Sequence, residues 1–182
     1  MYLILGIIKL FMHIFVDISA NPQKKVSVGC YLILENLNID TTGIKDLIQS
    51  VQLTSATSTD AELELIDFVL ATMKPQENQI FLYTDCHNFH KLFTNKCYQD
   101  RFDPANSRSG KAGSRRYAKD HHNALLYEKL LNHIRRLNLI VVKATGHSKK
   151  ELQKTVEQQI FAIIDKTARK IMRNMVKELN QI

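Results

Sequence analysis

The sequence predicts one α/β domain built on a mixed β-sheet that is flanked by helices. Its 182 residues are 45% hydrophobic, which is enough for a single domain with a buried core. Strand-like segments come first, and helix-like and strand-like segments then alternate, which is typical of helices packed on a mixed sheet. No internal repeat or low-complexity tract interrupts this order.

The expected strands are short apolar segments bounded by turn residues. Met12–Ile18 is almost continuously apolar, as in a strand covered on both faces. The turn residues Asn21-Pro22 then lead into Lys25–Leu34, which indicates a second strand entered through a hairpin. Three later segments are also expected to be strands, the first of them on weaker grounds: Ile48–Leu53, Gln79–Thr84 and Leu139–Val142.

The expected helices show apolar residues at helical spacing. Thr59–Met73 opens with Thr59-x-x-Glu62, the pattern of a capping box, and Pro75 ends it. The other expected helices are a segment through Phe89, Leu92 and Phe93, then Asn123–Leu137, and a long region over Glu151–Leu179. Between them, Asp100–Lys119 contains Pro, Gly, Ser and several cations and is expected to be a basic loop.

Positive charge is concentrated in one part of the chain. The net charge is +7, and Lys91–Lys154 holds 15 Lys and Arg against 5 Asp and Glu, a surplus of 10. The remaining residues hold 10 basic and 13 acidic side chains, a balance of −3. A basic segment of this kind can neutralise phosphates, although a solvated surface explains charge equally well when charge is considered alone.

The N-terminus and the cysteines bear on where the protein works. Residues 1–11 are apolar, but Lys9, His13 and Asp17 interrupt a run of membrane length, so we expect an extension followed by a domain over residues 12–182. A signal anchor is the alternative. Three cysteines without ligand spacing indicate neither a disulfide framework nor a zinc site, and they favour a reducing, cytoplasmic location.

Two aspartates follow apolar strands. Asp17 ends the first strand and Asp85 follows Gln79–Thr84. Side chains at the carboxyl ends of strands converge on the crevice where α/β folds place their sites. An Asp in either position also begins turns and caps helices, so neither residue is decisive alone.

Two further acids lie on the inward faces of expected helices. Glu62 shares a face with Ile66 and Val69, so its carboxylate points to the sheet unless it serves only the capping box. Asp165 lies in an apolar stripe and therefore needs a metal cation or a basic neighbour. Arg169 at i+4 could be this neighbour, in an ion pair with a purely structural role. Four acids of this kind suit two hard divalent cations, Mg²⁺ or Mn²⁺.

Four blocks of the sequence resemble the type 1 ribonuclease H family. They are Phe15-Val16-Asp17-Ile18-Ser19, Thr57-Ser58-Thr59-Asp60-Ala61-Glu62-Leu63, Tyr83-Thr84-Asp85, and Val142-Lys143-Ala144-Thr145-Gly146-His147 with Asp165-x-x-Ala168-Arg169. The resemblance covers most of the chain from Met12 to Arg169. It implies the ribonuclease H-like fold, with a five-stranded mixed sheet.

The resemblance also implies roles for individual residues. Asp17, Glu62, Asp85 and Asp165 would be the metal-binding catalytic acids, and His147 would be the loop histidine that moves protons near them. The sequence departs from the family pattern at Ile18, where Gly is usual, and at Ser58-Thr59-Asp60, where a polar Asn-Asn-Arg run is usual. The chain also lacks tryptophan, and these departures leave the substrate open.

The resemblance makes an RNA–DNA hybrid the expected substrate and an endoribonuclease the expected enzyme. The residues expected to contact substrate are Ser19, Ser58, Thr59, Arg115, Arg116 and Lys119. A 3′-5′ exonuclease or a structure-specific DNase of the same fold is the near alternative, but an exonuclease would normally carry an acid where Ser19 stands. A catalytically inactive nucleic-acid-binding module is the alternative from another class.

Overall fold

The computed structural model describes residues 11–55, 57–75, 79–103, 123–144 and 155–181. The strands are β1 (Phe11–Asn21), β2 (Val26–Leu34), β3 (Gln49–Leu53), β4 (Gln79–Thr84) and β5 (Leu139–Lys143). The helices are the 3-10 helix η1 (Ile44–Leu47) and α1 (Ser58–Thr72), α2 (His87–Thr94), α3 (Lys96–Phe102), α5 (Ala124–Arg136) and α6 (Val156–Leu179). Among the described residues, each strand and the helices α1, α2, α5 and α6 fall in or beside a segment where the sequence predicts one, whereas α3 is a helix that the sequence analysis did not predict.

The strands form one mixed sheet in the order β3-β2-β1-β4-β5. β1 pairs antiparallel with β2 and parallel with β4, and β4 pairs parallel with β5. The tight turn after Asn21 allows the antiparallel hairpin, whereas the parallel pairs need helical crossovers between their strands. This is the topology of the ribonuclease H-like fold, and the predicted α/β class is confirmed.

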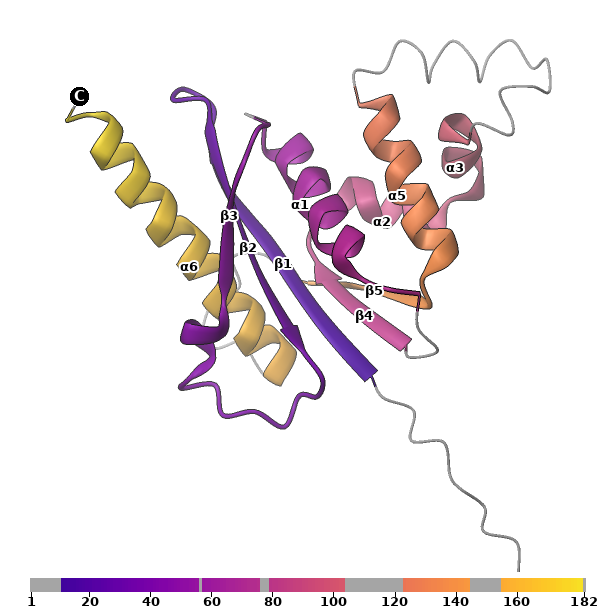
Figure 1. The fold of residues 1–182 in the computed structure, drawn as a ribbon, viewed down its shortest axis with the longest axis horizontal. Helices are drawn as coiled ribbons and strands as arrows, with labels where there is room; N and C mark the ends of the chain where they lie inside the picture. Colours follow the sequence, from indigo (N-terminus) through magenta and orange to yellow (C-terminus); the bar gives the residue numbers. More distant parts are fainter. Residues whose placement is uncertain (1–10, 56, 76–78, 104–122, 145–154, 182) are drawn as a thin grey trace, which may run out of the picture.

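Helices cover both faces of the sheet. In Figure 1, α1, α2 and α5 lie on one side of the strands and α6 runs alone across the other. Because successive side chains of a strand point to opposite faces, β1 contributes to two cores. Ile14 and Val16 pack with α1, α2 and α5, while Phe15 packs with Phe161 and Ile164 of α6.

A polar network joins α1 to α5. His133 Nε2 lies 2.9 Å from Asp67 Oδ1, and Arg136 Nε donates to His133 Nδ1 at 3.1 Å. Since Nδ1 accepts, Nε2 carries the proton and donates to Asp67. Arg136 also donates to the carbonyl oxygens of Leu70 and Met73, each at 2.5 Å, and so satisfies the C-terminal end of α1. This network fixes the position of α1 against α5.

Several predictions concern residues that the structure does not describe. Residues 104–119 of the expected basic loop and residues 1–10 lie outside the described residues. The loop prediction is wrong for Asp100–Phe102, which form the end of α3 because Tyr98 and Phe102 of that helix pack in the core. β1 begins at Phe11, one residue before the expected start of the domain. Within the described part of the chain, no helix has the length and apolar character needed to cross a bilayer.

β2 and α1 approach each other closely at Gly29. A Cβ added at Gly29 would lie 2.5 Å from Leu65 Cδ1, and Leu65 is fully buried. Any larger side chain at this position would therefore require the Leu65 side chain or the backbone of α1 or β2 to shift.

We predict that Gly29→Ala lowers the free energy of unfolding by about 1 to 3 kcal/mol, because the added methyl group overpacks this contact. In a Leu65→Ala background the same change should cost less than about 1 kcal/mol. Urea unfolding of the four proteins of this double-mutant cycle measures the difference, and an equal cost in both backgrounds would contradict the packing explanation.

Candidate active site

Asp17 lies on the sheet face that α6 covers. Phe15 and Tyr83 are the last paired residues of β1 and β4, and their rings stack with centroids 4.3 Å apart. Asp17 and Asp85 each follow this pair by two residues, so the two acids lie at the same level of the sheet. Asp17 also points to the same face as Phe15 and is only 8% exposed.

Asp165 reaches this region from α6. The helix places it beside Phe161, Ile164 and Ala168, whose side chains form the core between α6 and the sheet. Its side chain is 6% exposed, and it accepts a hydrogen bond from the guanidinium group of Arg169, one turn later. The ion pair with Arg169, which the sequence suggested as the structural explanation for Asp165, is therefore present.

Glu62 is not part of a capping box, which corrects the prediction for the start of α1. The N-cap is Thr57, whose hydroxyl accepts a hydrogen bond from the backbone N–H of Asp60. α1 begins at Ser58, so Glu62 is the fifth residue of the helix and lies beyond the capping position. Helix capping therefore does not explain the presence of Glu62. Its carboxylate instead accepts a hydrogen bond from the Cys86 thiol.

The electrostatics connect all four acids. Burial and the neighbouring charges of Asp85, Asp165 and Glu62 raise the pKa of Asp17 to about 8, against a smaller opposing effect of the Ile18 N–H. Burial and the charge of Asp85 also raise the pKa of Glu62. The other three acids, which are distant from Asp17 in sequence, therefore lie near enough to oppose its ionisation.

Buried thiols flank the acids. Cys86, next to Asp85, donates to Glu62, and Cys30 is paired with Asp17 across β1 and β2. Burial raises the pKa of Cys30 to about 12 and that of Cys86 still further, so both thiols are neutral at physiological pH. Sequence reasoning missed Cys86 as part of the site, although its position directly after Asp85 was a usable signal.

The donor chemistry of the site fits hard divalent cations, because carboxylate oxygens are the ligands that Mg²⁺ and Mn²⁺ prefer. A closed ligand set is not preformed, since no three His, Cys, Asp or Glu side chains of the described residues lie close enough together to hold one ion. The raised pKa of Asp17 is nevertheless compatible with an open ligand set, because charges act on one another over longer distances than the roughly 2.0–2.6 Å between a metal ion and its ligands. Asp165 and Glu62 each already accept a hydrogen bond, from Arg169 and from Cys86, with which a bound cation would share these carboxylates.

The other predicted site residues are placed in part. Ser19 follows Asp17 by two residues on the same face of β1, and Ser58 and Thr59 are exposed in the first turn of α1. The remaining predictions, His147, Arg115, Arg116 and Lys119, lie outside the described residues. The structure therefore places Asp85, Asp165 and Glu62 near enough to Asp17 for their charges to act on it, and the predicted roles of all these residues remain predictions.

The sequence matches no protein-family model and no curated protein. The fold and the geometry of the acids thus carry the functional argument.

The charge on Asp17 should make stability depend on pH. Its pKa is about 8 in the folded protein against an ordinary value of 3.8, so between these values the folded state binds more protons than the unfolded state. The free energy of unfolding therefore falls as pH rises through this window and levels off above it. In chelator, Asp17→Asn should remove this slope and stabilise the protein at pH 8 by about 1 to 2 kcal/mol.

Urea unfolding across this pH range measures the effect. Asp46→Asn, a change at an exposed acid of η1, is the matched control and should follow the wild type. If Asp17→Asn kept the wild-type pH dependence of the free energy of unfolding, Asp17 would not be the acid whose raised pKa causes it.

Proposed function

We propose that the protein is a metal-dependent endoribonuclease of the ribonuclease H type, which hydrolyses the RNA strand of RNA–DNA hybrids. The observation that carries this proposal is the joint effect of Asp85, Asp165 and Glu62 on the pKa of Asp17. Close carboxylates repel one another, and divalent cations are the usual compensation.

Each acid has a distinct structural support. Asp17 lies on β1 and Asp85 directly follows β4, the parallel neighbour of β1, while Glu62 and Asp165 come from helices on opposite faces of the sheet. Ligands on rigid elements keep their geometry better than ligands on loops. Bound divalent cations, two ions in this proposal, would neutralise the carboxylates and polarise the scissile phosphate.

Protons and cations compete for this site. Asp17 keeps its proton up to about pH 8 while no cation opposes the neighbouring charges, and a carboxylate must be deprotonated to bind a metal ion. Binding therefore releases a proton, and the proposal accounts for a buried acid cluster that otherwise only destabilises the fold.

The choice of substrate rests on the resemblance and on the polar residues near the acids. Ser19 lies beyond Asp17, and Ser58 and Thr59 lie one turn before Glu62, where hydroxyl groups can donate to phosphate or sugar oxygens. Recognition of a hybrid requires contact with the 2′-hydroxyl of one strand.

One observation favours a second candidate, a catalytically inactive nucleic-acid-binding module. Arg169 already neutralises Asp165, as a structural ion pair would. A binding module needs the fold and its basic surface but no metal ion.

Cleavage assays separate these candidates. The wild type should cleave a labelled RNA–DNA hybrid with Mg²⁺ or Mn²⁺ but should cleave duplex RNA and single-stranded DNA poorly. Asp85→Asn should lower cleavage by about 10²-fold or more, because it removes one charged ligand. Asp46→Asn is the matched control and should retain activity. Cleavage that persists in chelator would eliminate the metal mechanism, and preference for another substrate would eliminate the hybrid.

Arg169 should compete with cations for Asp165. We predict that Arg169→Gln lowers the Mg²⁺ concentration for half-maximal activity by about two- to fivefold, because it frees the Asp165 carboxylate. Lys45→Gln, at an exposed position of η1, is the matched control. An unchanged or higher Mg²⁺ requirement in Arg169→Gln would show that the ion pair supports the site rather than competing with it.

A further inference from the structure

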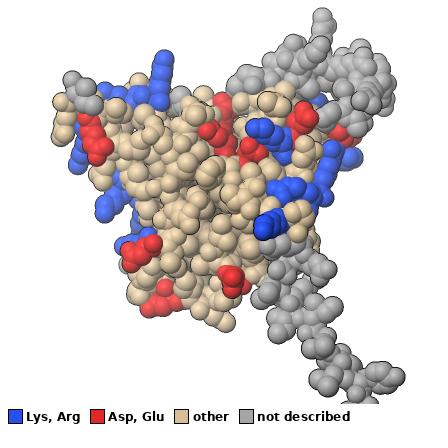
Figure 2. All heavy atoms as spheres, viewed as in Figure 1, with Lys and Arg blue, Asp and Glu red and all other residues tan. Residues whose placement is uncertain are grey.

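The outer surface of α6 carries an exposed row of cations, here called the α6 stripe: Lys166, Lys170, Arg173 and Lys177. At 100° per residue these four positions fall within about 60° of arc. Buried Ile164, Ala168 and Met172 lie on the opposite side of the helix, against the sheet. Figure 2 shows Lys and Arg side chains along the margin of the molecule that α6 forms.

The α6 stripe has no internal compensation. None of its four side chains forms an ion pair with any residue in the described part of the chain, and Glu157 and Glu178 lie at other angles around the helix. The spacing instead places these cations next to one another on the helix surface. Lys166 and Lys170 are four residues apart, and Lys170 and Arg173 are three residues apart. Like charges at these spacings destabilise a helix.

We propose that the α6 stripe binds the phosphate backbone of a nucleic acid outside the four-acid site. The stripe extends over eleven residue steps from Lys166 to Lys177, about 16 Å at 1.5 Å per residue. That length matches about five phosphates along one strand at 3.4 Å each. Phosphates alongside the helix would relieve the repulsion between its cations and release counterions.

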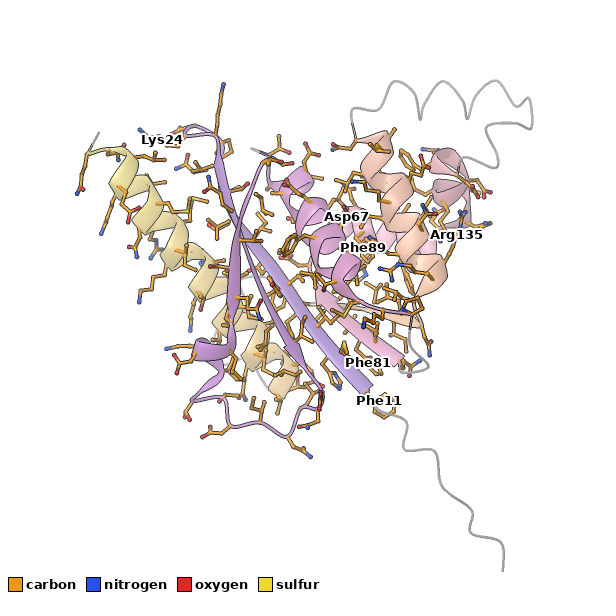
Figure 3. All side chains as sticks on the ribbon, in the orientation of Figure 1. Phe11, Lys24, Asp67, Phe81, Phe89 and Arg135 are labelled. Carbon is orange, nitrogen blue, oxygen red and sulfur yellow. The ribbon has the colours of Figure 1, made fainter. Side chains whose placement is uncertain are left out.

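The α6 stripe begins beside the four acids and leads away from them along the outer surface of α6. Lys166 follows Asp165 directly, and the stripe then continues to the C-terminal end of α6. The β1–β2 turn lies at the same end of the molecule, and Lys24 projects there (Figure 3). A nucleic acid longer than the cleavage site would therefore have a second cationic track along α6.

A nucleic acid fits this surface better than an anionic bilayer does. Membrane-surface helices combine cations with a large apolar face directed at the lipid. On α6 the apolar face is buried against the sheet, and the four-cation stripe faces away from it. The choice of nucleic acid as the polyanion rests on the proposed function, whereas the cationic surface itself does not.

The test compares two variants that each remove three lysine charges. Lys166→Gln/Lys170→Gln/Lys177→Gln alters the stripe, and Lys45→Gln/Lys74→Gln/Lys143→Gln alters three exposed lysines elsewhere. Binding to a fluorescent hybrid of about 20 base pairs is measured by anisotropy in chelator, between about 50 and 200 mM salt. Each lost phosphate contact reduces the magnitude of the negative slope of log K against log salt by about 0.9.

The stripe variant should lower the magnitude of this slope by about 2 to 3 and weaken binding at least tenfold, while the control should change the slope by less than about 1. Equal effects of the two variants, or no effect of either, would overturn the proposal. The stripe variant should also melt no lower than the wild type at low salt, because it removes like-charge neighbours. A lower melting temperature would contradict the account of the stripe as a repulsive row.

Two further arms separate the alternatives. If the wild type sediments with phosphatidylserine vesicles and only the stripe variant loses this binding, with an unchanged hybrid slope, the partner is a membrane and the proposal fails. Absence of hybrid cleavage in Mg²⁺ with the expected slope difference would reject the nuclease but retain the stripe. Cleavage with no slope difference would reject the stripe alone.

Discussion

Asp17 is held between the sheet and α6 with little solvent around it, and the charges of Asp85, Asp165 and Glu62 act on it. This grouping of like charges is the constraint on which the functional interpretation of the protein depends. Ionised carboxylates are costly to bury, and several in one place are costlier still. The fold tolerates the cost because the surrounding elements are fixed by apolar cores on both faces of the sheet.

The position of α1 matters for this grouping as much as the strands do. Its N-terminal end is capped by Thr57 and its C-terminal carbonyls are satisfied by Arg136, which in turn contacts the His133–Asp67 pair. Glu62 thus belongs to a helix whose two ends are both fixed. The Cys86 thiol, which donates to Glu62, orients the carboxylate without adding a charge.

Most of the elements, and the positions of the acids on them, were predictable from sequence because they depend on local patterns. Asp17 and Asp85 stand after apolar strands, and Asp165 interrupts an apolar helical stripe. The cap of α1 was assigned wrongly because Thr57 and Thr59 are both good capping residues, and tertiary contacts such as the Asn123–Asp60 hydrogen bond are not visible in sequence. The α6 stripe was missed because charge counted over long segments averages its cations with distant acids, whereas its alignment requires knowledge of which helix face is buried.

The order of the elements along the chain has a consequence for biosynthesis. α6 follows all five strands of the sheet, yet together with Ile44 of η1 it covers the sheet face formed by Phe15, Cys30 and Leu32. A ribosome therefore releases the whole sheet before the helix that shields this face, and the apolar surface stays open to water or to chaperones until α6 docks. Asp165 arrives with that helix, so the grouping of acids around Asp17 is complete only once α6 has docked on the sheet.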